Sequence, residues 1–120
     1  GLLVWSPLAG GFLSGKFTRT GGDDAARRAT FDFPPVNKDK AYDIIDVMVP
    51  IAAAHGASVA QVALAWLLGK PATIVIPKAT NAVHLRENFA ALDLKLTDDD
   101  VAVLDRAFPP PEKKYALEML

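Results

Sequence analysis

Two short loops carry groups that could hold a phosphorylated ligand. The first, WSPLAGGFLSGKF (residues 5–17), follows a short apolar run and contains three glycines, two serines and Lys16. Glycines let backbone N–H groups approach oxyanions closely, and the lysine adds a positive charge. The second, PKATN (77–81), places Lys78 and Thr80 just before an expected helix N-terminus, whose dipole favours an anion. Together the two loops could hold a pyrophosphate and one further phosphate.

Each of these features also has an ordinary structural explanation. A glycine-rich turn after a strand is more often only a turn, and this loop matches neither the GxGxxG nor the Walker pattern. Lys78 and His84 could be solvated surface residues, and Glu87 beside Asn88 could belong to a solvated helix face. Trp5 at a strand end is usually part of a core, although its ring could stack on a planar ligand. Taken singly, none of these residues defines a site.

The composition is ordinary for a globular protein and argues against several functions. The 120 residues are 51% hydrophobic and 22% charged, with 13 basic and 14 acidic residues for a net charge of −1. Such a balance provides no field to attract nucleic acid or an anionic membrane, so neither is expected as a partner. There is no cysteine, and the two histidines are far apart in sequence, so no metal site is expected. With no apolar run of bilayer length and no signal-peptide pattern, we expect a cytoplasmic protein.

The first loop is expected to follow a strand and to open a long irregular segment. LLVW (2–5) is a continuous apolar run stopped by Pro7, which is typical of a buried parallel strand covered on both faces. Residues 9–38 contain five glycines, a proline pair and mixed charges without clear periodicity. Loops of this length in compact domains are usually functional or disordered, so 9–38 is expected to be a long loop beside the ligand.

Helices and one further strand are expected after this loop. Apolar residues recur at helical spacing from Asp39, with Pro50 expected to kink that helix and Gly56 to end it. Ser58 with Gln61 forms a capping-box pattern that predicts a second helix. The remaining expected elements are a buried strand TIVIP (73–77), a helix capped by Asn81, a helix capped by Thr97 with Asp100, and a tail over 108–120.

The order of these elements indicates right-handed βα units and a parallel sheet. Two strands cannot form a stable sheet with both faces covered, because their outer edges and much of their apolar surface would stay exposed. Residue 1 is not methionine, and the sequence enters a strand at once. We therefore expect the C-terminal portion of a longer protein, completed by the missing N-terminal half or by self-association.

The motifs resemble those of the aldo-keto reductase family. WSPLAGGFLSGKF is similar to the strand-seven motif of that family. VIPKATNAVHLRENFAAL (75–92) is similar to its strand-eight motif, in which an acidic residue and an asparagine occupy the first turns of the following helix. AAAHGASVAQVALAWLL (52–68) matches the family's paired helices, and LKLTDDDVAVLDRA (94–107) its last barrel helix. Two motifs in the right order and separation, over nearly the whole chain, are far more specific than either alone.

The resemblance implies an α/β fold, the C-terminal part of a (β/α)8 TIM barrel, with a nicotinamide cofactor extended across its C-terminal rim. Trp5 would stack on the nicotinamide, and Lys16 and Arg28 would reach phosphates or adenosine from the long cofactor-side loop 9–38. The positions that match the family's pyrophosphate path are Ser6, Pro7, Leu8 and Gly10. The positions that match its contacts to the ribose phosphate and adenine are Lys78, Ala79, Thr80, Glu87 and Asn88, with His84 where the family commonly has arginine or glutamine.

The resemblance also shows what the sequence lacks. The family's reaction uses a tetrad of aspartate, tyrosine, lysine and histidine, in which the tyrosine donates a proton to the carbonyl as hydride arrives. No position in 1–120 matches those motifs, and neither Tyr42 nor Tyr115 fits the role. No catalytic residue is therefore assigned within this chain.

The implied function is NAD(P)H-dependent reduction of aldehydes or ketones to alcohols by the complete protein, acting on a small-molecule carbonyl substrate. This chain would supply the cofactor half-site and would be inactive alone. Lys78 favours NADPH, with NADH possible. Two alternatives stay open: a dinucleotide-sensing or regulatory subunit without turnover, and a catalytically inactive structural fragment.

Overall fold

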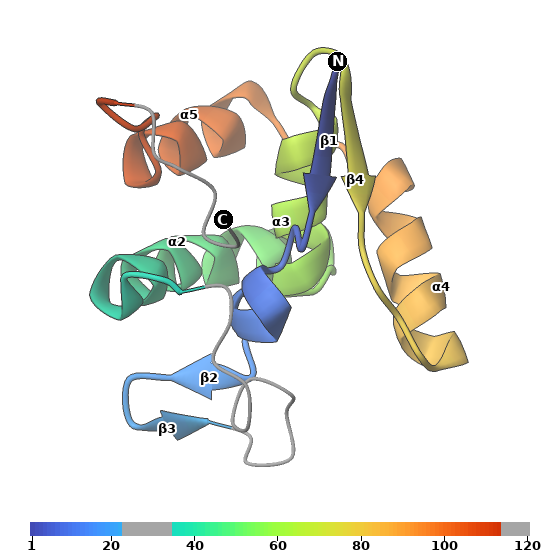
Figure 1. Ribbon diagram of the computed structural model, residues 1–120, viewed down its shortest axis with the longest axis horizontal. Helices are drawn as coiled ribbons and strands as arrows, with labels where there is room; N and C mark the ends of the chain where they lie inside the picture. The colour runs from blue at the N-terminus through green and yellow to red at the C-terminus, as the bar shows by residue number, and fades with distance from the viewer. Residues whose placement is uncertain (23–34, 114–120) are drawn as a thin grey trace.

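The computed structural model describes residues 1–22 and 35–113 and places a pair of parallel strands against several helices (Figure 1). The described elements are, in chain order, β1 (Leu2–Trp5), the 3-10 helix η1 (Ala9–Ser14), β2 (Phe17–Thr18), β3 (Gly21–Gly22), α2 (Lys38–His55), α3 (Val59–Leu68), β4 (Thr73–Ile76), α4 (Ala82–Ala90), the 3-10 helix η2 (Ala91–Asp93) and α5 (Asp98–Ala107). The predicted strands, the four predicted helices and the parallel pairing are confirmed.

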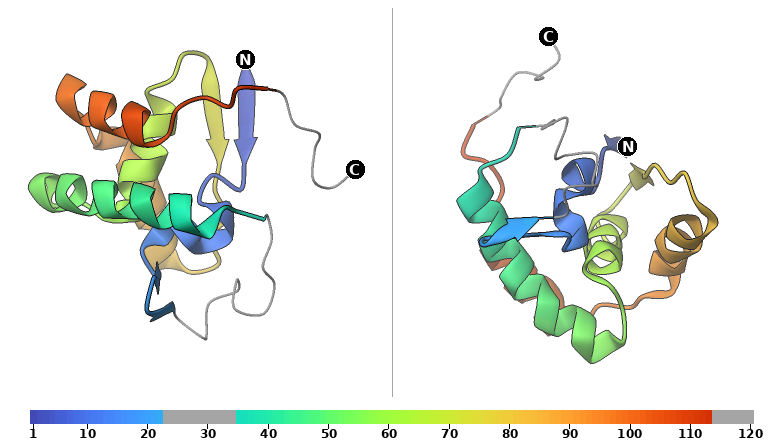
Figure 2. Two further views of the ribbon diagram at one scale, coloured as in Figure 1. Left: turned by 90° about the vertical axis from the view of Figure 1, so that its left-hand side faces the viewer. Right: turned by 90° about the horizontal axis from the view of Figure 1, so that it is seen from below.

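One face of the strand pair is covered and the other is open. β1 and β4 pair in parallel, with Leu3 opposite Ile74 and Trp5 opposite Ile76. Alternate side chains on a strand point to opposite faces, so these four side chains share one face, called here the open sheet face. They are 65%, 61%, 51% and 51% exposed, respectively. The helix α3 packs against the opposite face, and no described helix or strand covers the open one (Figure 2). Because the described residues supply helices for only one face, the strands are not covered on both faces, and the expected open apolar surface is confirmed.

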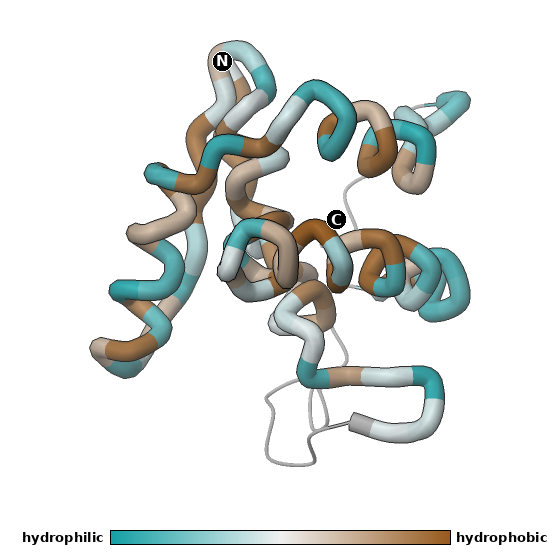
Figure 3. Tube along the Cα trace, turned by 180° about the vertical axis from the view of Figure 1, so that it is seen from behind, coloured by the Kyte–Doolittle hydropathy of each residue, from teal (hydrophilic) through white to brown (hydrophobic). Residues whose placement is uncertain are grey.

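The hydrophobic core lies away from the open sheet face, where α2 and α3 meet η1 and α5. Along α2, hydrophobic and hydrophilic residues alternate at helical spacing (Figure 3). Burying the apolar stripe of such a helix stabilises it far more than its intrinsic propensity does. The buried core residues are Phe12, Ala41, Ile45, Met48, Ile51, Ala52, Val62, Ala63 and Leu104.

The helix termini agree closely with the sequence patterns. The Ser58 hydroxyl accepts from the Gln61 N–H, and the Gln61 side chain accepts from the Ser58 N–H, which is the predicted capping box of α3. Thr97 and Asp100 form the same reciprocal pair at α5. Asn81 caps α4 through its side-chain oxygen. These three predictions are confirmed.

The helix α2 begins one residue before the predicted start and ends where the sequence pattern predicted. It begins with Asn37 as N-cap, whose side chain accepts from the Lys40 N–H at 3.1 Å. It continues as one helix across Pro50 and ends at Gly56, which adopts a left-handed conformation with φ of +61°. Glycine suits that position because it has no Cβ to clash there.

The segment 9–38 carries more regular structure than the sequence indicated. η1 and a short antiparallel hairpin of β2 with β3 occupy its first part. These elements are too short to show periodicity in the sequence, and the role of 9–38 as a cofactor-side loop stays a prediction. Arg28 lies outside the described residues.

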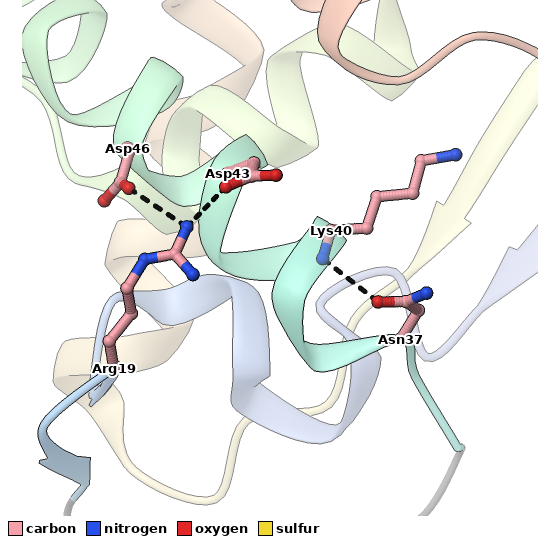
Figure 4. A network of polar contacts seen from close by, with 5 residues as sticks. All are labelled: Arg19, Asn37, Lys40, Asp43 and Asp46. Atoms are coloured by element: carbon pink, nitrogen blue, oxygen red, sulfur yellow. Dashed lines mark hydrogen bonds and ion pairs between the residues drawn. The ribbon is translucent and has the colours of Figure 1, made fainter.

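Arg19 anchors this hairpin to α2 (Figure 4). Its guanidinium bonds to the Asp43 carboxylate and lies 3.6 Å from Asp46 Oδ2. It also lies over the Tyr42 ring, 5.4 Å from the centroid. The bond to Asp43 raises the pKa of Arg19 further above its already high value. Because all three charged groups are solvent-accessible, the contact positions the hairpin more than it stabilises the fold.

Neither a simple membrane span nor a metal cluster is found in the described parts of the chain. No single helix there is long and apolar enough to cross a bilayer. Taken together, α2 and α3 have the required length and apolar composition, but they are bent by 94° relative to each other, and length and composition are the only grounds for considering them. Residues 1–22 and 35–113 also hold no group of three or more His, Asp or Glu side chains that could bind a metal ion.

An unpredicted polar contact ties the end of α2 to the start of α5. His55 Nε2 lies 2.7 Å from Asp100 Oδ2, and the two side chains are only 22% and 20% exposed. The hydrogen bond from His55, followed by that from the Thr97 N–H, holds the pKa of Asp100 below its usual range. The carboxylate that caps α5 therefore also joins two helices.

We expect this contact to make stability depend on pH in the acid range. The pKa of Asp100 is lower in the folded than in the unfolded state, so its contribution is complete above an unfolded pKa of about 4. It is lost as pH falls through the lower, folded-state pKa. In urea unfolding of the complete protein, Asp100→Asn should lower the free energy of unfolding by about 1–2 kcal/mol near neutral pH, and the deficit should vanish in strong acid. Asp99→Asn is the matched control, and a deficit for Asp100→Asn that is constant with pH would contradict the assignment.

Candidate functional site

One pocket of about 320 Å³ brings the two predicted loops together at the carboxyl ends of β1 and β4. We call it the rim pocket. One wall comes from residues 6–16 and the other from residues 77–88. Figure 1 shows the first segment following β1 and the second running from β4 into α4. The residues that line it are Ser6, Pro7, Leu8, Gly10, Gly11, Ser14, Lys16, Ala60, Pro77, Lys78, Ala79, Thr80, His84, Glu87 and Asn88.

The rim pocket contains most of the residues that the sequence singled out. Of the thirteen predicted cofactor-binding residues, all line this pocket except Trp5 and Arg28. Trp5 ends β1 on the open sheet face, directly before Ser6, and Arg28 lies outside the described residues. The structure thus gathers eleven of the predicted residues, whose role in binding a cofactor stays a prediction.

The first wall is shaped by its own hydrogen bonds. The Gly10 N–H donates to the Ser6 hydroxyl oxygen at 3.2 Å, and the Gly11 N–H donates to the Leu8 carbonyl at 3.0 Å. These two N–H groups, which the sequence suggested for contact with oxyanions, are therefore already used within the loop. Gly11 has a φ of +94°, although an added Cβ would meet no atom within 4 Å. Backbone conformation rather than crowding is the reason for glycine there.

A strained residue begins this wall. Ser6, directly after β1, has a φ of +51°, which costs a non-glycine residue about 1–2 kcal/mol. Its hydroxyl oxygen receives the Gly10 N–H, so a side-chain bond holds the unusual turn. Such strained positions are concentrated at functional sites in proteins.

The second wall is organised by the N-cap of α4. The Asn81 side-chain oxygen accepts from the His84 N–H at 2.8 Å, and its Nδ2 lies 3.2 Å from His84 Nδ1. An amide nitrogen can only donate, so His84 Nδ1 accepts in this arrangement. The lysine of this wall is Lys78.

The charges that line the rim pocket favour an anion. Lys16 and Lys78 are exposed, and neither has an ion-pair partner among the described residues. Glu87 is the single carboxylate among the lining residues. Thr80 and Asn88 are further hydrogen-bonding groups, whereas the Ser14 hydroxyl already donates to the Gly11 carbonyl. With the two lysines, this donor set suits phosphate oxygens.

Sequence reasoning missed Ala60, which lines the pocket from the first turn of α3. A signal for it existed. The Ser58–Gln61 capping box marks the N-terminus of a helix that leads into a parallel strand, and such a helix begins near the carboxyl ends of the strands.

Comparisons with known proteins identify the family. The sequence model of the aldo/keto reductase family matches residues 1–108. The chain is 42% identical over 74 residues to methylglyoxal reductase YeaE of Escherichia coli (strain K12), covering 62% of this chain and 26% of that protein. It is 33% identical over 102 residues to an NADH-specific methylglyoxal reductase of the same organism, covering 84% and 31%. A crystal structure of the thermostable aldo-keto reductase Tm1743 with the inhibitor epalrestat matches with a TM-score of 0.60 and 32% identity, over 89% of this chain and 29% of that one.

The chain therefore belongs to the aldo-keto reductase family. Its fold is the C-terminal part of a TIM barrel, with two parallel strands and flanking helices that do not close a barrel by themselves. The chain spans about a third or less of the length of the relatives described above.

Proposed function

We propose that the complete protein reduces aldehydes or ketones to alcohols with a nicotinamide dinucleotide, and that the rim pocket is its cofactor half-site. The observation that carries the proposal is the convergence of two loops, about sixty residues apart in sequence, on one pocket with two lysines that have no ion-pair partner within 1–22 and 35–113. Membership in the family supports oxidoreduction. Similarity to two methylglyoxal reductases supports a small carbonyl compound as substrate. A cytoplasmic location is part of the proposal.

The residues of the pocket fit the parts of such a cofactor. Lys16 and Lys78 would neutralise phosphate charge from opposite walls, and Trp5, half-exposed beside Ser6, would stack on the nicotinamide ring. The residues that would follow the pyrophosphate are Ser6, Pro7, Leu8 and Gly10. The residues that would hold the adenosine and its ribose phosphate are Lys78, Ala79, Thr80, His84, Glu87 and Asn88. Arg28 would add a contact from the long loop.

The chemistry divides between this chain and the rest of the protein. When bound, the cofactor supplies the hydride. This chain binds and orients the cofactor, whereas the proton for the carbonyl oxygen would come from a tyrosine that 1–120 does not provide. NADPH is the proposed cofactor because Lys78 can pair with the additional ribose phosphate, and NADH would be the weaker alternative.

We expect the complete protein to bind both cofactors and to turn over, and the isolated 120-residue chain not to turn over. Fluorescence titration measures binding, and loss of NADPH absorbance with methylglyoxal or an unrelated aldehyde measures turnover. Absence of binding to both cofactors by the complete protein would overturn the proposal. Binding without turnover would favour the sensing or regulatory alternative. Steady NADPH oxidation by the isolated chain, free of host enzymes, would show that its proton donor lies within 1–120.

A further inference from the structure

A single side-chain amide connects two elements that border the rim pocket. Gln61 occupies the third position of α3, where its Oε1 accepts from the Ser58 N–H at 2.9 Å. Its Nε2 donates to the backbone carbonyl of Glu87, in the last turn of α4, at 3.0 Å. The oxygen of this amide thus caps the N-terminus of α3, and its nitrogen forms a hydrogen bond to a different helix.

The carbonyl of Glu87 is available because of how α4 ends. At the C-cap of α4 the backbone N–H groups bond to the carbonyls of Asn88 and Phe89, as the chain tightens into η2. Carbonyls in the last turn of a helix lack intrahelical partners and need others. The Gln61 amide supplies the partner for Glu87.

The position of α4 depends on few other contacts. No residue of α4 is buried, and Leu85 and Phe89 are 60% and 71% exposed. The hydrogen bond from Gln61 is nevertheless partly buried. It lies at the helix segment whose Glu87 and Asn88 line the rim pocket, opposite the first wall. A small shift of α4 would therefore change the width of the pocket directly.

We propose that Gln61 is a positioning residue of the rim pocket, which holds the Glu87–Asn88 wall at the separation that the adenosine end of the ligand requires. The inference rests on the proposed function of the pocket. Gln61 itself does not line the pocket, so it acts through the α4 backbone.

Two variants separate this role from helix capping. Gln61→Glu keeps the capping acceptor, since glutamate is as suitable as glutamine at this position, but it cannot donate to the Glu87 carbonyl. Ser58→Ala removes a capping acceptor and leaves the donor to Glu87 in place. The first variant tests the bridge between the helices, and the second tests the cap.

The test measures ligand affinity and thermal stability of the complete protein in wild-type, Gln61→Glu and Ser58→Ala forms. The ligands are NADPH, 2′,5′-ADP as its adenosine end, and reduced nicotinamide mononucleotide as its other end. We expect Gln61→Glu to weaken NADPH and 2′,5′-ADP by roughly threefold to tenfold, with the mononucleotide and the melting temperature nearly unchanged. We expect Ser58→Ala to lower the melting temperature and to leave all three affinities nearly unchanged.

Each other outcome is decisive. If the wild-type protein binds 2′,5′-ADP and Gln61→Glu binds it equally tightly, the positioning role is wrong and the proposed function stands. If Gln61→Glu loses affinity for all three ligands together with thermal stability, its role is only structural and the inference is wrong. If the wild-type protein binds none of the three, the proposed function fails and the inference fails with it.

Discussion

Replacing Lys78 by methionine is expected to remove most of the preference for NADPH over NADH that we propose for the complete protein. Lys78 lies two residues after the end of β4, is exposed, and lines the rim pocket shortly before the N-terminus of α4. A charge-assisted contact to the ribose phosphate, which NADH lacks, is worth about 1.5–3 kcal/mol. Lys78→Met should therefore weaken NADPH binding by roughly ten- to a hundredfold and leave NADH binding nearly unchanged. Methionine keeps much of the unbranched stem of lysine and removes only the charged end.

Two other lysines provide matched controls for that experiment. Lys16→Met alters the opposite wall of the rim pocket and should weaken both cofactors to a similar degree, since the pyrophosphate is common to them. Lys95→Met alters an exposed lysine that does not line the rim pocket and should change neither affinity. Fluorescence titrations with both cofactors decide the matter. Equal losses of affinity for NADPH and NADH in Lys78→Met would show that Lys78 does not contact the ribose phosphate.

The discrimination is assigned to Lys78 rather than to His84 because of the N-cap of α4. His84 Nδ1 accepts a hydrogen bond from the Asn81 amide, and the same amide holds the His84 N–H. His84 Nδ1 is thus engaged within the cap of α4, whereas Lys78 lies outside the cap and is exposed at the rim pocket.

Features that depend on a few neighbouring residues could be predicted from the sequence. The capping pairs Ser58–Gln61 and Thr97–Asp100 each act over three residues, so their residue types are sufficient. The convergence of Lys16 and Lys78 was also predictable, because loops that follow parallel strands lie at the same edge of a sheet.

Features that depend on contacts between distant residues could not be predicted. His55 and Asp100 are 45 positions apart, and neither residue type nor spacing marks them as a pair. The same holds for Arg19 with Asp43, and for the amide of Gln61 at the carbonyl of a distant helix. Such pairs follow from how the helices pack, which only the folded chain specifies.

The exposure of the open sheet face leads to the second large expected effect, which concerns the isolated 120-residue chain. Its four apolar side chains are each at least half-exposed, and within the described residues β1 and β4 pair only with each other. Covering one such side chain fully is worth about 1.5–3 kcal/mol, and the unpaired strand edges favour further pairing. We expect the isolated chain to self-associate, so that light scattering gives a mass above 12.8 kDa.

Paired substitutions on the two faces of the sheet test the cause of that association. Leu3→Thr with Ile74→Thr keeps residues that favour strands and makes two opposed positions of the open face more polar, so it should shift the isolated chain toward the monomer. Val4→Thr with Val75→Thr alters the opposed pair on the face that packs against the helices, and it should lower the stability of the fold without favouring the monomer. A wild-type chain that is monodisperse at 12.8 kDa and melts cooperatively would contradict the prediction, because four exposed apolar side chains and two open edges would then be tolerated in water without a partner.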